Sequence, residues 1–165
     1  MKASHTVKRS ARVHVAMVLI LAAIAALVAS PAAAGPSTFG LGIVIGEPTG
    51  INAKLFLDGN NALDMAAAWS LSGDNDLHLR VDYIFHRYQL IKVDKGKLPF
   101  FFGLGGRVEF RENRDDKVGV RVPVGLAYEF ANAPFDVFGE IVPVLELTPD
   151  TDFEFEGAIG VRFWF

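Results

Sequence analysis

Residues 153–165 read FEFEGAIGVRFWF, and this stretch alternates between two kinds of side chain. Its odd-numbered positions are apolar apart from Gly157, whereas its even-numbered positions include Glu154, Glu156 and Arg162. Successive side chains of a β-strand point to opposite faces of the sheet. The stretch therefore predicts a strand with one apolar face and one charged face.

The same alternation recurs in seven earlier stretches, which are separated by segments rich in residues that favour turns. These stretches are residues 39–45, 51–57, 63–71, 77–86, 100–111, 118–130 and 137–147. Helical periodicity does not occur after residue 35. The sequence predicts an all-β fold of eight antiparallel strands that run up and down. Most of these strands have the roughly 9–11 residues that a strand needs to span a membrane.

The first 34 residues are predicted to be a secretory signal that precedes a single domain, residues 35–165. Four basic residues and no acid precede an apolar run at residues 15–28, and the run ends before the small residues Ala32 to Ala34. A membrane-spanning helix needs about 20 apolar residues, so this run is too short. The pattern is typical of a signal that is cleaved after export.

Composition excludes several classes of function. The 165 residues include no cysteine, which excludes disulfide scaffolds, thiolate metal sites and cysteine nucleophiles. Four of the 16 basic residues and none of the 19 acids lie in the predicted signal, so residues 35–165 carry a net charge of −7. Nucleic-acid binding needs basic patches, and we therefore expect no nucleic-acid partner.

Alternation alone leaves open whether the apolar face points inward, as in a soluble barrel, or outward, as in a transmembrane barrel. We expect it to point outward. The polar face carries charges of both signs beside small residues, and side chains fill the interior of a small eight-stranded barrel. The charges are predicted to form a network in the lumen, and they are Lys54, Asp64, Arg80, Asp82, Arg107, Glu109, Arg111, Arg121, Glu129, Glu140, Glu146, Glu154, Glu156 and Arg162.

Aromatic residues support the same orientation. If the chain starts in the periplasm, the aromatic side chains of the apolar face fall into two belts. The periplasmic belt consists of Phe39, Phe85, Phe100, Phe102, Tyr128, Phe130, Phe163 and Phe165, and the outer belt consists of Trp69, Phe110, Phe153 and Phe155. Aromatic girdles at both interfaces are typical of barrels in lipid.

The last six residues, GVRFWF, resemble the C-terminal signal that outer-membrane proteins present to the barrel-assembly machinery. Its elements are Gly160, Phe163 and Phe165, and Ala158 stands where a polar residue is usual. Residues 39–50, FGLGIVIGEPTG, resemble a family of uncharacterised small bacterial outer-membrane barrels, similar in size to the OmpA transmembrane domain and to OmpX. The resemblance implies an eight-stranded barrel in the outer membrane and no particular activity.

We predict a small integral outer-membrane β-barrel with a plugged, charged lumen and a structural or interaction role. The alternative is a narrow channel or transporter for a small solute, in which lumen salt bridges exchange partners. The expected partners are the lipid bilayer with its lipopolysaccharide, the barrel-assembly machinery and periplasmic chaperones. Acidic turns at residues 74–76 and 150–152 lack the spacing of a calcium-binding EF-hand, so no metal or cofactor is expected.

An enzyme that modifies lipid A is a third possibility. His78, Asp82 and His86 share one strand face, and Ser70 lies on the preceding strand, which suggests a Ser-His-acid hydrolase. However, positions four residues apart along a strand are about 13 Å apart. Lipid A deacylases also carry their His and Ser two positions apart, unlike this chain. We therefore interpret the histidines as lumen residues with satisfied partners and expect no catalysis.

Two prolines do not fit an uninterrupted barrel. Pro123 and Pro143 lie inside predicted strands, where proline cannot donate to the hydrogen-bond ladder. We expect a local bulge or gap at each. The connections between strands are predicted to be short on both sides, about seven residues at most, which leaves little surface for an adhesin.

Overall fold

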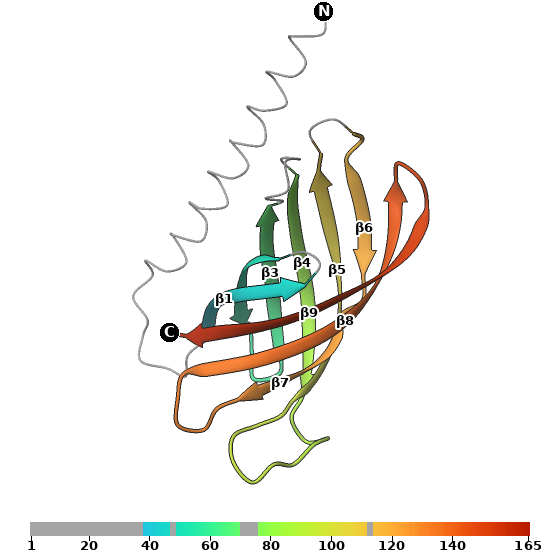
Figure 1. Ribbon diagram of the computed structural model, residues 1–165. Helices are drawn as coiled ribbons and strands as arrows, with labels where there is room; N and C mark the ends of the chain where they lie inside the picture. The colour runs from blue at the N-terminus through green and yellow to red at the C-terminus, as the bar shows by residue number, and fades with distance from the viewer. Residues whose placement is uncertain (1–37, 47–48, 70–75, 112–113) are drawn as a thin grey trace, which may run out of the picture.

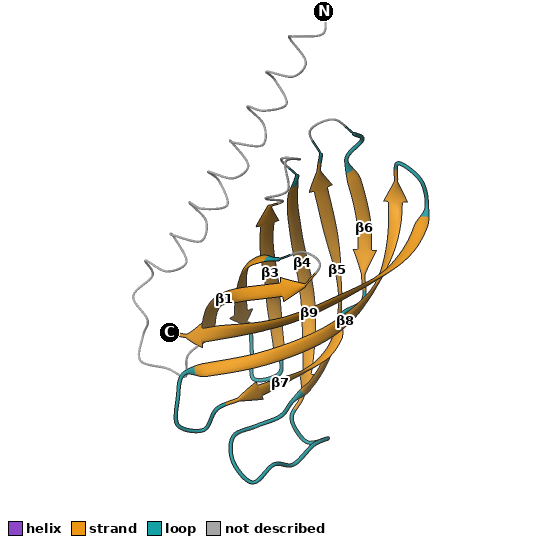
Figure 2. Ribbon diagram, viewed as in Figure 1, coloured by secondary structure: helices purple, strands orange, loops and turns teal. Residues whose placement is uncertain are grey.

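The computed structural model describes residues 38–46, 49–69, 76–111 and 114–165. The predicted signal at residues 1–34 lies outside this part, as do Ser70 and residues 74–75 of one acidic turn. Figures 1 and 2 show the described part as strands, turns and loops of one strongly curved sheet. None of its residues forms a helix long and apolar enough to cross a membrane.

Nine strands form this sheet in the described part of the chain. They are β1 (Phe39–Gly46), β2 (Gly50–Phe56), β3 (Asn61–Trp69), β4 (Leu77–Arg87), β5 (Phe100–Phe110), β6 (Lys117–Arg121), β7 (Val124–Glu129), β8 (Phe135–Thr148) and β9 (Asp152–Trp164). The all-β, antiparallel prediction is confirmed. Nine strands stand where eight are predicted, because the stretch 118–130 is divided into β6 and β7.

Each strand has neighbours on both sides. Strands β1 to β5 pair in sequence, β5 pairs with both β6 and β7, these two pair with β8, and β9 joins β8 to β1. The β1–β9 seam has seven residue pairs, from Gly40 with Trp164 to Gly46 with Ala158. Residues 152–157 of β9 pair only with β8 in the described part. The last strand is thus paired with the first through a short seam.

The sheet has two ends, which we name by what they contain (Figure 1). The C-terminal rim contains the start of β1, the β2–β3 turn, the β4–β5 loop, the β7–β8 turn and the end of β9. The opposite rim contains the ends of β3, β5 and β8 and the starts of β4, β6 and β9. The β4–β5 loop, residues 88–99, is longer than the predicted maximum. Its apolar side chains Leu90 and Val93 are exposed.

The division between β6 and β7 is caused by proline. Pro123 lies between β6 and β7, and Pro143 of β8 lies opposite the neighbouring residue Val122. The Val122 amide donates to the Pro143 carbonyl over 3.0 Å. The amide and carbonyl of one strand residue face the same neighbour, so the donor that Pro143 lacks faces the break and not β9. The β8–β9 ladder therefore continues without interruption.

A bulge or a gap is expected at each proline, and the structure shows a break between β6 and β7 without a bulge. Residue pairing between β5 and the β6–β7 segment keeps one register across the break, from Gly105 with Arg121 to Phe102 with Val124. The irregularity in this part of the sheet lies at Val118 and Gly119, where pairing with β8 shifts. Proline thus removes hydrogen bonds here without moving the strands past one another.

The two faces of the sheet differ as the alternation predicts. Large apolar side chains point outward and are exposed, with Ile141 63% and Phe155 65% accessible. Inward-facing residues are buried, and most of the large ones are ionisable. The buried apolar cluster is small and consists of Val44, Ala66, Ile84, Phe101, Ala127, Phe138 and Ala158. The interior is therefore held mainly by polar contacts.

The Gly125→Ala variant is expected to lose about 1–3 kcal/mol of unfolding free energy, the usual cost of overpacking. A Cβ atom at Gly125 would meet the Gly139 carbonyl and the Phe101 ring, the latter at 2.5 Å. Gly157→Ala is the matched control, because a Cβ there meets nothing within 4 Å. Urea unfolding of both variants in detergent measures the difference, and equal losses would show that the interior is loosely packed.

Candidate functional site: the charged interior

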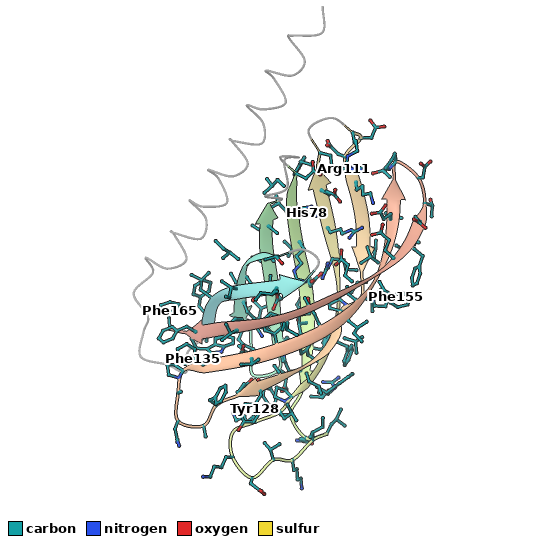
Figure 3. The ribbon with its side chains drawn as sticks, viewed as in Figure 1. His78, Arg111, Tyr128, Phe135, Phe155 and Phe165 are labelled. Carbon is teal, nitrogen blue, oxygen red and sulfur yellow. The ribbon has the colours of Figure 1, made fainter. Side chains whose placement is uncertain are left out.

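Most of the charged residues predicted for the lumen lie inside the sheet. Ten of them are buried, namely Lys54, Asp64, Arg80, Asp82, Arg107, Arg121, Glu140, Glu146, Glu156 and Arg162. Glu109, Arg111, Glu129 and Glu154 are half-buried. Figure 3 shows side chains from many strands filling the space that the sheet encloses, with Arg111 and His78 near the opposite rim. Their contacts divide into two clusters.

The upper cluster is nearer the opposite rim and is centred on Arg121, which is fully buried. Its guanidinium contacts Asp82 at 3.2 Å, Glu140 at 3.8 Å and also Glu156. Glu140 in turn contacts Arg80. One cation thus joins carboxylates from three strands, β4, β8 and β9.

Arg107 extends the upper cluster toward the opposite rim. It contacts Glu146, Glu156 and, at 2.8 Å, Glu154. Lys117 lies 2.8 Å from Glu146 and 3.3 Å from Glu154. The upper cluster therefore combines four cations with five carboxylates in one continuous set of contacts.

The lower cluster is nearer the C-terminal rim and has two cations and two carboxylates. Arg162 lies 2.7 Å from Asp64 and 3.0 Å from Asp136, while Lys54 lies 3.7 Å from Asp64. The Asn52 amide donates to Asp64 over 2.6 Å. Buried carboxylates and cations are thereby paired, which offsets the large cost of removing them from water.

An aromatic layer lies between the lower cluster and the C-terminal rim. Phe56 lies 4.9 Å from the His86 ring and 5.3 Å from the Trp164 ring, and Phe101 lies 6.0 Å from His86, measured between ring centroids. The Lys54 ammonium is 5.1 Å from the Phe101 centroid, within the range of a cation–π contact. The layer covers the lower cluster with ring faces.

Sequence reasoning missed several members of the interior. Asp136 is 1% exposed, but the predicted strand began one residue later. Lys117 lies just outside the predicted stretch 118–130, although it is the first residue of β6. Asn52 and Phe101 alternate in phase with the charged positions of their strands. Their position in the alternation therefore indicates the inner face, although neither side chain is charged.

The histidines do not come together. His78 Nδ1 lies 3.8 Å from Glu109 Oε2 near one rim, whereas buried His86 has its Nδ1 3.0 Å from the Asn60 carbonyl near the other. Ser70 lies outside the described residues. Asp76 contacts Arg114 at 2.8 Å. No group of three or more possible metal ligands occurs among the residues that the structure describes.

Aromatic side chains gather on the outer face at the C-terminal rim. Phe39 and Phe165 lie 6.1 Å apart, Phe163 and Phe165 lie 4.9 Å apart, and Phe135 and Phe163 lie 5.1 Å apart between ring centroids (Figure 3). Of the predicted outer belt, Phe153 and Phe155 are 5.0 Å apart on β9, while the Trp69 side chain lies outside the description. Two residues of the predicted assembly signal, Phe163 and Phe165, thus belong to this aromatic group.

A curved sheet with an apolar outer face and a charged interior places the chain in the class of β-barrels, and a solved structure has the same fold. The chain is similar to the N-terminal β-barrel domain of OprF from Pseudomonas aeruginosa, with a TM-score of 0.54 and 16% identity over 77% of this chain and 95% of that one. No curated protein matches the sequence.

Residues 34–165 match the family described as "Protein of unknown function (DUF3996)", and the chain belongs to this family. The OprF domain confirms the barrel fold that the resemblance implies, and not the particular family of small outer-membrane barrels.

Proposed function

We propose that this chain is a small integral β-barrel protein of the bacterial outer membrane. In this proposal β6 and β7 form one span, so that eight spans run up and down after a signal cleaved near residue 34. The orientation of the two faces carries the proposal. In water, this arrangement would expose large apolar side chains and desolvate charges, whereas in a bilayer the same apolar side chains contact hydrocarbon.

Two further observations support this location. The aromatic group at the C-terminal rim has the character of an interfacial girdle, and it includes the last residue of the chain. The family match begins at residue 34, where the sequence predicts the end of the signal. In this proposal the barrel-assembly machinery recognises Gly160, Phe163 and Phe165, periplasmic chaperones deliver the chain, and lipid and lipopolysaccharide surround it.

We further propose that the lumen is a plug and that the role is structural or that of an interaction platform, without enzymatic activity. The upper cluster crosses the interior from β4 to β9, and the aromatic layer covers the lower cluster. Both obstruct a water-filled path. His78 and His86 have separate partners at opposite rims, which argues against a shared catalytic site.

A narrow channel is the second candidate, and the shared carboxylates favour it. Glu156 contacts both Arg107 and Arg121, and Glu140 contacts both Arg80 and Arg121. A carboxylate that already touches two guanidinium groups can release one without becoming unpaired. Such exchange would let a small ion pass the upper cluster without the full cost of a buried unpaired charge.

The test uses protein isolated from the outer-membrane fraction of producing cells. We expect unboiled and boiled samples to migrate differently on a gel, as a closed barrel does. The same protein in planar bilayers should give no stable conductance of nanosiemens size, because charged side chains fill the lumen.

Different results would decide between the candidates. Recovery from the periplasm as a soluble protein, without a mobility shift, would contradict the membrane location. A mobility shift together with steady large conductance steps would contradict only the plug. Small ion-selective steps would favour the narrow channel.

A further inference from the structure

A cavity of about 490 Å³ opens at the C-terminal rim, on the outer side of the aromatic layer. We call it the rim pocket. The start of the described chain, the β2–β3 turn, the β4–β5 loop, the β7–β8 turn and the end of β9 all contribute to its lining. Its volume is in the range of small-molecule sites, and the role proposed for the interior does not account for it.

Ring faces form much of the wall of the rim pocket. Phe56 and Trp164 line it with centroids 5.3 Å apart and planes inclined at 32°. Tyr88 adds a third ring, which stacks on His86 at 6.0 Å. The Trp164 indole N–H donates to Asp136 over 3.1 Å, so this ring is held in place. The pocket therefore offers oriented aromatic surfaces to a ligand.

Two carboxylates line the rim pocket with neutral partners. Asp58 Oδ1 accepts from the amides of Asn60 and Asn61 over 2.7 Å and 2.8 Å, and these bonds hold the pKa of Asp58 below its usual value. Glu129 accepts from the Tyr88 hydroxyl over 2.8 Å. Within the described residues neither carboxylate forms an ion pair. Both therefore contribute negative charge to the pocket without a direct ion pair to offset it.

Lys97 is the single cation among the described residues that line the rim pocket. Its ammonium lies 5.4 Å from the centroid of the Tyr88 ring. Its backbone exchanges two hydrogen bonds with Glu129, at 3.0 Å and 2.8 Å, which fix the loop to β7. A cation thus already lies over one ring of the pocket, and two carboxylates outnumber it.

We propose that the rim pocket binds an organic cation with an apolar body, such as a quaternary ammonium compound or an alkylamine. The rings of Phe56, Tyr88 and Trp164 contact the apolar body and attract the charge through their faces. Asp58 and Glu129 add the negative potential that selects a cation over an anion. Lys97 competes with the ligand for the same surroundings.

The experiment follows the fluorescence of Trp164. The chain has two tryptophans, so a Trp69→Phe background leaves Trp164 as the only reporter. The full protein is kept in uncharged maltoside micelles. It is titrated with choline and, separately, with 3,3-dimethylbutan-1-ol, which has the same shape without the charge. We expect choline to cause a saturable change in Trp164 fluorescence. The alcohol should bind with an affinity at least about fivefold lower, since a cation–π contact contributes about 1 kcal/mol.

Three variants in this background sharpen the test. Glu129→Gln keeps the acceptor for Tyr88 and should weaken choline binding about three- to tenfold. Lys97→Met should strengthen it, because the competing cation is removed. Asp150→Asn, at an exposed position on the opposite rim, is the matched control and should leave binding unchanged. The heat-dependent gel shift verifies that each variant is folded.

Several results would overturn the proposal. Equal binding of choline and the alcohol would make the rim pocket an apolar site without charge selection. Binding of benzoate that disappears in Lys97→Met would make it an anion site. A fluorescence signal that responds to none of the probes would show that the pocket binds no such cation.

Discussion

The Arg121→Ala variant is expected to lose about 3–5 kcal/mol of unfolding free energy, the typical cost of breaking a buried ion pair. Arg121 is 0% exposed, and its removal leaves Asp82, Glu140 and Glu156 without the cation that joins them. Two of these acids keep a contact with Arg80 or Arg107. Asp82 has no other ion pair in the described part, and we expect most of the loss to come from it.

Urea unfolding of the protein in lipid vesicles measures this loss. Arg114→Ala is the matched control, since Arg114 pairs with Asp76 at 2.8 Å but its side chain is 54% exposed. Asp76 is buried, but water reaches the exposed Arg114 guanidinium, so we expect the loss in Arg114→Ala to be only about 1 kcal/mol. Arg121→Lys should recover part of the loss, because it restores the charge without the guanidinium geometry. Equal, small losses in Arg121→Ala and Arg114→Ala would mean that water solvates the lumen freely.

The Ile141→Arg variant is expected to lose about 2–4 kcal/mol and to assemble poorly in membranes, as charged residues do on the lipid face at mid-membrane. Ile141 lies near the middle of β8 and points outward. Leu90→Arg is the matched control. Its side chain is 66% exposed, close to the 63% of Ile141, but it lies in the β4–β5 loop.

The two arginine variants together distinguish a barrel whose apolar outer face contacts lipid from a soluble barrel. The fraction of unboiled protein that keeps the fast, folded mobility is measured in vesicles for both. For a protein surrounded by lipid, only Ile141→Arg should lower this fraction. If both variants fold as well as the parent, the apolar face does not contact hydrocarbon, and a soluble barrel would fit better.

The period of two in the sequence predicts which face of the sheet each side chain occupies, because successive side chains of a strand point to opposite faces. It therefore placed Arg80, Arg121 and Glu140 on the inner face. It does not predict which of them meet. Arg80 contacts Glu140, 60 positions away in the sequence, and such a contact depends on the register between strands, which alternation leaves unspecified.

Strand ends and interruptions were also beyond the pattern. The pattern misses Asp136 because the predicted strand begins at Val137 and not at Phe135, an apolar residue in the same phase. It misses the aromatic layer because Phe101 carries no charge. At Pro123, alternation continues through a break in the hydrogen-bond ladder. The alternation records side-chain orientation only, whereas a strand ends where backbone hydrogen bonds end.

The short β1–β9 seam has a consequence for the order of folding. Each hairpin connects residues that are close in the sequence, but the seam joins the first described strand to the last, so the largest loop must close to form it. It then gains only seven residue pairs, against twelve between β8 and β9. We therefore expect this seam to be the last to form during assembly and the first to exchange its amide hydrogens with solvent, so that the kinetic lifetime of the closed molecule is set where its two ends meet.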